Sequence, residues 1–277
     1  MVRSLSLWAF LLVFCPAWVV GCGNSDGVTR LRITGSTSLQ PLITELALRY
    51  EAAHPGVRID IEAGGSTRGI NDAIRGTVSL GMASRPLMPN EQAAVDSVPV
   101  ALDGLAIVTH ADHQLSGLDR TQITQILDGT VRRWSQIDPT QGDRPIILVQ
   151  RAEGRGELAA ILAYTGLEAS DLRADAVAGA TLEALRQVEA NSDGITYLSM
   201  GAALIERARG GEIHLPTVDG VEQTSEAVAE GRYPLVRPLL LVLPRTLSPE
   251  AEAFLAFATS PEADDLIQEL AFVAPPR

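Results

Sequence analysis

The feature that most constrains the fold is a repeated local pattern: a short strand, a turn of glycine and hydroxyl residues, and an amphipathic helix. Residues 31–34 form a short, largely apolar segment that runs into Gly-Ser-Thr-Ser at 35–38, after which apolar residues recur at spacings of three and four. Residues 57–62 alternate like a strand and lead into Gly-Gly-Ser-Thr at 64–67, followed by a second helical pattern. This repetition predicts an α/β fold of parallel strands with covering helices, in which ligands bind beyond the carboxyl ends of the strands.

The length and two apolar runs further along the chain predict two lobes. Residues 103–110 and 233–243 are largely apolar and suit buried strands that connect one lobe to the other. We therefore expect central mixed sheets joined by crossover hinge strands. The first lobe is then discontinuous, formed by residues 29–107 and 235–277, and the second lobe is residues 108–234.

The N-terminal segment has the pattern of a lipoprotein signal peptide. Arg3 precedes an apolar run too short to span a membrane, and Val-Val-Gly leads to Cys22. We predict a signal peptide at 1–21, lipid attachment at Cys22 and a flexible tether at 22–28. An ordinary signal peptide with an incidental cysteine is the alternative. The prediction places the protein in the periplasm or at the cell surface, attached to the membrane through Cys22.

Charge and motif content exclude several classes of function. The net charge of −12 argues against a nucleic-acid partner, although it leaves room for a small anion held by local donors. His110 and His113 lie close together without a clear third ligand, so we expect no metal site and no cofactor. The chain has no nucleophile elbow and no phosphate-cradling loop that ends in Lys, and we therefore do not expect an enzyme.

The two hydroxyl turns and two arginines are the candidate ligand groups. The first turn contains Ser36, Thr37 and Ser38, which can cap the first helix, bind an oxyanion, or do both. The sequence alone does not distinguish these roles. Arg85 and Arg151 each follow a predicted strand, one in each lobe. A solvated loop position is the usual role of such an arginine, but two guanidinium groups facing each other across a cleft would neutralise a doubly charged anion.

Several motifs in order along the chain resemble those of the phosphate-binding proteins of bacterial ABC importers. They are TGSTSLQPL (34–42), GGSTRGI (64–70), GMASRPL (81–87), LDGLAIVTH (102–110), ITQILDGTVRRWSQI (123–137), YPLVRPL (233–239) and FLAFATSPEADDLI (254–267). The resemblance implies a type II periplasmic binding protein with two lobes that close like a hinge on one dehydrated phosphate. It also implies a monomer that delivers the ligand to the membrane subunits of an ABC permease.

The resemblance also implies the ligand-contacting positions. These are Thr37, Ser38, Leu39, Ser66, Thr67, Ser84, Arg85 and Arg151, with Arg155, Gly156 and Glu157 in the loop after Arg151. That loop departs from the family pattern Arg-x-x-Gly-Ser-Gly-Thr, because Arg155 and Glu157 replace both hydroxyl residues. Glu157 can accept the proton of monohydrogen phosphate; it can pair with Arg155 and fill part of the site; or both side chains can face solvent while backbone N–H groups bind.

We therefore predict capture of inorganic phosphate for an ABC importer. Three alternatives remain open at this point. The ligand can be another tetrahedral oxyanion such as sulfate, molybdate or tungstate; the protein can be a sensor or interaction lipoprotein on the same fold; or it can be a secreted phosphohydrolase.

Overall fold

The computed structural model describes residues 28–276. The predicted signal peptide, Cys22 and the tether up to residue 27 lie outside the described residues and stay predictions. The strands are β1 (Thr29–Gly35), β2 (Val57–Ala63), β3 (Leu80–Ala83), β4 (Asp96–His110), β5 (Gly117–Leu118), β6 (Ile147–Arg151), β7 (Ala176–Ala178), β8 (Gly194–Ser199), β9 (Ile213–His214), β10 (Thr217–Val218) and β11 (Val236–Leu243).

The α-helices alternate with these strands, as the sequence pattern predicts. They are α1 (Gln40–Ala53), α2 (Ser66–Ile74), α3 (Pro89–Gln92), α4 (Arg120–Leu127), α5 (Gly156–Thr165), α6 (Thr181–Glu189), α7 (Met200–Ala208), α8 (Ser225–Ala229), α9 (Pro249–Ala258) and α10 (Asp264–Glu269). Short 3-10 helices lie at Trp134–Gln136, Pro139–Gln141, Ala169–Asp171 and Pro261–Ala263. Within residues 28–276, no helix combines the length and the apolar character required to cross a membrane.

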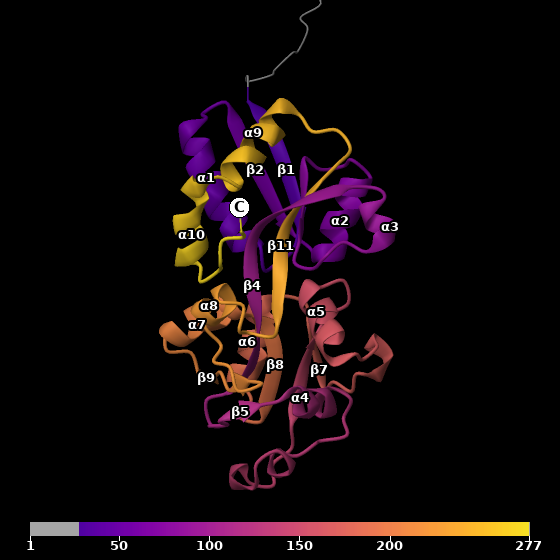
Figure 1. The fold of residues 1–277 in the computed structure, drawn as a ribbon, viewed down its shortest axis with the longest axis vertical. Helices are drawn as coiled ribbons and strands as arrows, with labels where there is room; N and C mark the ends of the chain where they lie inside the picture. Colours follow the sequence, from indigo (N-terminus) through magenta and orange to yellow (C-terminus); the bar gives the residue numbers. More distant parts are fainter. Residues whose placement is uncertain (1–27, 277) are drawn as a thin grey trace, which may run out of the picture.

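A single mixed sheet path runs through both halves of the molecule, in the order β2-β1-β3-β11-β4-β8-β6-β7. β1 is parallel to β2 and β3, and β8, β6 and β7 are parallel to one another, while β11 and β4 are antiparallel to their neighbours on this path. β4 pairs with β11 in its first part and with β8 in its second. Figure 1 shows these two strands passing between the two lobes, which confirms the predicted architecture.

The buried apolar side chains divide between the lobes. One large cluster extends from Leu31 to Ala101 and resumes at Leu239, so the first lobe is built from both ends of the chain. A second large cluster begins at Leu105 and ends at Leu235, and a third, smaller cluster within the first lobe includes Ile70 and Val242. The sequence predicts Leu105 and Leu235 in the first lobe. They pack with the second because β4 runs from one lobe into the other without a loop, and Leu235 comes directly before β11.

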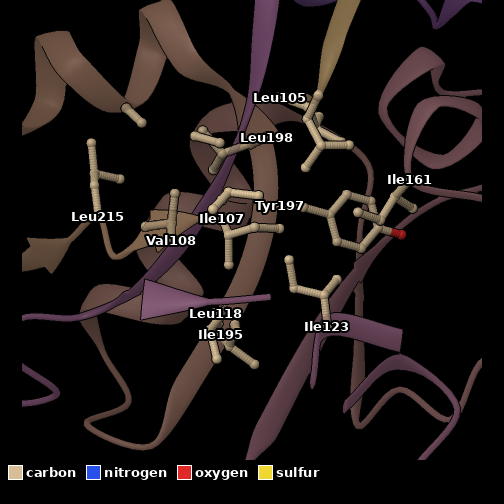
Figure 2. Close-up of a cluster of buried hydrophobic side chains, with 14 of the residues drawn as sticks. Leu105, Ile107, Val108, Leu118, Ile123, Ile161, Ile195, Tyr197, Leu198 and Leu215 are labelled. Atoms are coloured by element: carbon tan, nitrogen blue, oxygen red, sulfur yellow. The ribbon is translucent and has the colours of Figure 1, made fainter. Parts of the chain in front are cut away.

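The core of the second lobe surrounds Tyr197 on β8. Figure 2 shows Ile107 of β4, Ile123 of α4 and Ile161 of α5 around it. The Tyr197 hydroxyl accepts a hydrogen bond from the backbone N–H of Arg151 at 3.3 Å. The end of β6 is therefore fixed by the core from which it projects.

The two turns of the repeated pattern lie at the starts of α1 and α2. α1 buries Leu42, Ile43, Leu46, Ala47 and Tyr50, the positions predicted from the spacing, and has a proline in its first turn, where no N–H is required. The first residue of α2 follows Gly65, whose φ of 92° favours glycine. Both turns open at the carboxyl ends of parallel strands.

Candidate functional site

The site lies where the two lobes meet at the crossing strands. The first lobe contributes the turns after β1 and β2 and the end of β3, and the second contributes the loop between β6 and α5. The lobes are in contact there: the Thr67 N–H donates to the Gly154 carbonyl at 3.1 Å, across the boundary. The structure is therefore a closed arrangement of the two lobes.

Close approach of the lobes requires a glycine at position 156, the first residue of α5. A Cβ at Gly156 would overlap the Ser84 side chain and lie 2.5 Å from the Ser84 carbonyl oxygen. The N-terminus of α5 thus packs directly on the end of β3. Free N–H groups at such a helix start favour a negative charge.

The hydroxyls of the first turn divide into two roles. Ser36 Oγ accepts the Leu39 N–H at 3.4 Å, so this serine makes the local turn contact and Leu39 is buried behind it. Ser38 is also buried, but its hydroxyl donates across the boundary to Glu157 Oε1 at 2.7 Å. The structure therefore gives the local contact to Ser36 and the interlobe contact to Ser38.

The serines of the second and third turns bond to each other. Ser66 Oγ lies 3.1 Å from Ser84 Oγ and also accepts the Ser84 N–H at 3.0 Å. Both side chains are completely buried. They form a buried hydroxyl pair at the end of β3.

Glu157 lies at the centre of the site, and side chains from both lobes contact it. Its side chain is only 1% exposed, and its carboxylate is flanked by Arg151 Nη2 at 3.7 Å and Arg237 Nη1 at 3.6 Å. Burial opposes ionisation, but the charges of Arg237 and Arg151 and the Ser38 hydrogen bond outweigh it, so the pKa of Glu157 lies below its ordinary value. The site holds a buried carboxylate supplied by the chain itself.

Arg151 is completely buried at the end of β6 and is only partly paired. Its Nη1 donates to the Ala180 carbonyl at 2.7 Å. Its Nε and Nη2 have no hydrogen-bond partner within residues 28–276, since Glu157 is too distant to accept one. Burial lowers the pKa of Arg151, with Glu157 acting in the opposite direction. Buried donors without an acceptor reduce the stability of the folded protein, and an additional acceptor would stabilise them.

Arg237 is a central residue of the site that the sequence reasoning missed. It lies on β11 opposite Asp103 of β4 and donates to that carboxylate at 2.8 Å and to Ser38 Oγ at 2.9 Å. A further bond reaches Ser84 at 3.2 Å. Burial raises the pKa of Asp103, against the effect of Arg237 and Ser199. The signal that could have found this pair is a single charge of opposite sign in each of the two apolar runs, Asp103 in 103–110 and Arg237 in 233–243.

Arg85 is not where the sequence reasoning expects it. Its guanidinium is buried in the first lobe and donates to both carboxylate oxygens of Glu91, at 2.7 and 2.8 Å, and to the Pro86 carbonyl. No hydrogen bond or ion pair joins it to Arg151 or Glu157 among the described residues. The structure does not pair Arg85 with Arg151, because a carboxylate six positions along the chain satisfies Arg85; the two arginines that flank Glu157 are Arg151 and Arg237.

The remaining predicted residues lie at the edge of this cluster. Arg155 extends to within 3.2 Å of a Cβ built at Gly65, and its Nη1 has no hydrogen-bond partner within residues 28–276. Thr37 is half-buried beside an interlobe cavity. The predicted pairing of Arg155 with Glu157 is not among the described ion pairs, and Glu157 does not face solvent.

The interlobe cavity lies beside the polar cluster rather than within it. Its volume is about 450 Å³, and mainly apolar residues line it, including Leu182, Ile205 and Phe272. Two partners of the charged cluster also border this cavity: Ser38, which contacts Glu157 and Arg237, and Ala180, whose carbonyl accepts from Arg151. This cavity is therefore mostly apolar, with Glu206 and Arg209 also in its wall, while Arg151 and Arg237 lie beside the carboxylate of Glu157.

The chemistry of the cluster is that of anion binding. Two guanidinium groups, a serine hydroxyl and a helix start surround one buried negative charge. Among these contacts no hydroxyl is paired with a histidine base, and Ser38 donates to an ionised carboxylate. The arrangement can bind and desolvate an oxyanion.

Comparison with known proteins agrees with this fold. A family model described as the PBP superfamily domain matches residues 23–262. The phosphate-binding protein PstS of Borreliella burgdorferi is 24% identical over 273 residues, covering 95% of this chain and 96% of that protein. PstS 2 of Streptococcus pneumoniae is 34% identical over 108 residues, covering 39% of this chain and 37% of that protein.

Solved structures show the same architecture. A protein of Clostridium perfringens, described as a phosphate ABC transporter substrate-binding protein with bound phosphate, superposes with a TM-score of 0.84 at 29% identity, covering 90% of this chain and all of that one. An ABC-type phosphate transport receptor of Vibrio cholerae gives 0.74 at 28% identity, with 88% and 100% covered. With its family model matched over most of its length, this chain belongs to the PBP superfamily.

Proposed function

We propose that the chain captures inorganic phosphate between its two lobes and presents it to the membrane subunits of an ABC importer. The observation that carries the proposal is the set of buried Arg151 and Arg237 donors without a hydrogen-bond partner among the described residues, next to Ser38 and the start of α5. A carboxylate offers two oxygens to these donors, whereas a phosphate offers four. The relatives named for phosphate binding support the same ligand.

The same proposal includes the location and the state of the protein. A lipid at Cys22 and a tether at 22–28 would hold a monomer outside the cytoplasmic membrane. The site binds and releases its ligand without making or breaking a covalent bond. The cluster supplies hydrogen-bond donors for an anion, and its contacts do not pair a nucleophile with a general base. Closure would derive its free energy from contacts made by both lobes and by the crossing strands.

Thermal unfolding of the lipid-free protein with separate additions of phosphate, sulfate, molybdate and tungstate tests the ligand. Phosphate at 100 times its dissociation constant should add about 2.7 kcal/mol of stability. The other three anions should add markedly less. Stabilisation by a different oxyanion would replace the ligand and keep the binding mechanism, whereas no stabilisation by any of the four would contradict the proposed function.

A further inference from the structure

The Glu157 carboxylate is bound in the way an anionic ligand would be. It accepts from Ser38 of the first lobe, lies between Arg151 of the second lobe and Arg237 of a crossing strand, and is 1% exposed. Its own backbone N–H, at the start of α5, also contributes to lowering its pKa. All parts of the molecule that would close on a ligand thus already contact this side chain.

We propose that Glu157 is a resident competitor of the ligand: its carboxylate occupies the anion site, holds the lobes together without ligand, and must leave when phosphate binds. This inference rests on the proposed function and adds how the site is regulated. It assigns an affinity-determining role to a residue that stands where the family pattern has a threonine.

Electrostatics favours exchange over joint occupancy. An ionised Glu157 cannot donate a hydrogen bond to phosphate, and two negative groups in contact inside a buried site repel each other strongly. Two buried guanidinium groups already face two carboxylates, Glu157 and Asp103, so this inner group of four has no excess positive charge. Removal of the Glu157 carboxylate leaves this group with a net positive charge, which favours binding of an anion.

The incomplete bonding of Glu157 indicates that it is a replaceable occupant. Its contacts with Arg151 and Arg237, at 3.7 and 3.6 Å, are ion pairs without hydrogen bonds. Nε of Arg237 and Nε and Nη2 of Arg151 have no hydrogen-bond partner within residues 28–276. A tetrahedral anion with four acceptor oxygens can satisfy donors that the carboxylate leaves unpaired.

The cross-lobe contacts show what holds the ligand-free form closed. Ser38 to Glu157 is a side-chain bond between the lobes, and Thr67 to Gly154 is a backbone bond. Replacement of Glu157 removes the only one of these two that involves a charge. The lobes should then separate until an external anion takes the place of the carboxylate.

Isothermal titration with phosphate tests the competition. Glu157→Gln keeps the shape and removes the charge, and Glu157→Thr shortens the side chain. Both variants should bind phosphate at least about tenfold more tightly than the unsubstituted protein, because a tethered competitor acts at a high effective concentration. Glu153→Gln, an exposed position in the same loop, serves as the matched control and should leave the affinity unchanged.

Small-angle X-ray scattering tests the second half of the proposal without relying on phosphate affinity. The unsubstituted protein should have the same radius of gyration with and without phosphate, while Glu157→Thr should be larger without phosphate and contract when it is added. Equal or weaker phosphate binding by both variants, or a compact Glu157→Thr protein without ligand, would overturn the inference. If no protein binds phosphate, the proposed function fails, and expansion of Glu157→Thr still decides whether Glu157 holds the lobes closed.

Discussion

Two buried arginine–glutamate pairs in this protein have the same place in the sequence pattern and different properties. Arg85 and Glu91, like Arg151 and Glu157, are six positions apart; each arginine lies at or just after the end of a strand, and each glutamate is in the first turn of the next helix. The first pair lies within one lobe and is joined by two bonds of 2.7 and 2.8 Å. In the second pair, Arg151 Nη2 lies 3.7 Å from Glu157 Oε1, where the two lobes meet.

The difference shows how the surroundings decide the role of a buried ion pair. Glu91 also accepts the Met88 N–H, so its pair is closed and locally satisfied. Glu157 instead bonds to Ser38, on the opposite lobe, and leaves donors of Arg151 unpaired among the described residues. The first pair can stabilise one lobe, whereas the second depends on how the lobes meet. Four substitutions test this contrast.

The largest expected effect is on stability. Arg85→Ala leaves Glu91 buried without its cation and should reduce the free energy of unfolding by about 3–5 kcal/mol. Urea unfolding measures this loss. Arg75→Ala is the control, since its pair with Asp72 has an arginine side chain that is 63% exposed, and it should cost less than about 1 kcal/mol. Similar losses in the two variants would show that the Arg85 pair is not a structural anchor.

A strong effect on binding is expected at the second pair. Arg151→Ala should weaken phosphate binding by about 100-fold, because it removes a buried guanidinium that faces the anion. Titration calorimetry measures the affinity. Arg132→Ala, an exposed arginine of the same lobe, should bind phosphate like the unsubstituted protein. Full retention of affinity by Arg151→Ala would exclude the proposed site.

The pH dependence of the free energy of unfolding should reflect the ion pair between Arg85 and Glu91. The hydrogen bonds from Arg85 lower the pKa of Glu91 in the folded protein. The resulting stabilisation is present above the unfolded pKa, near about 4.3, and is lost as the pH falls through the lower folded value. Glu91→Gln should therefore cost about 2 kcal/mol at pH 7. Its deficit should shrink on acidification, and a deficit that is constant from pH 7 to pH 3 would contradict this account.

The smallest expected effect concerns the contact between the lobes at Gly156. Gly156→Ala places a methyl group against Ser84 and should hold the lobes apart, with about a tenfold loss of phosphate affinity. Scattering should show a larger radius of gyration. Gly179→Ala is the control, because its Cβ meets ordinary contacts of 3.5 and 3.6 Å. An unchanged radius and affinity would mean that closure does not need the glycine.

Local patterns in the sequence determined the fold class. The spacing of apolar residues predicted α1 and α2, and the glycine and hydroxyl turns predicted where the strands would open toward a site. The apolar runs at 103–110 and 233–243 predicted the crossing strands. These features were accessible because periodicity and turn chemistry act between residues that are near one another along the chain.

The tertiary structure alone decided which charges meet. Arg237 reaches Asp103 across 134 positions and Ser38 across 199, and Glu157 reaches Ser38 across 119. Arg85 has the same local features as Arg151, yet Glu91 bonds it fully within the first lobe, whereas Glu157 bonds to Ser38 of the opposite lobe. Such pairings depend on strand register and on the approach of the two lobes, which no local pattern encodes, and they placed a carboxylate of the chain in its own anion site.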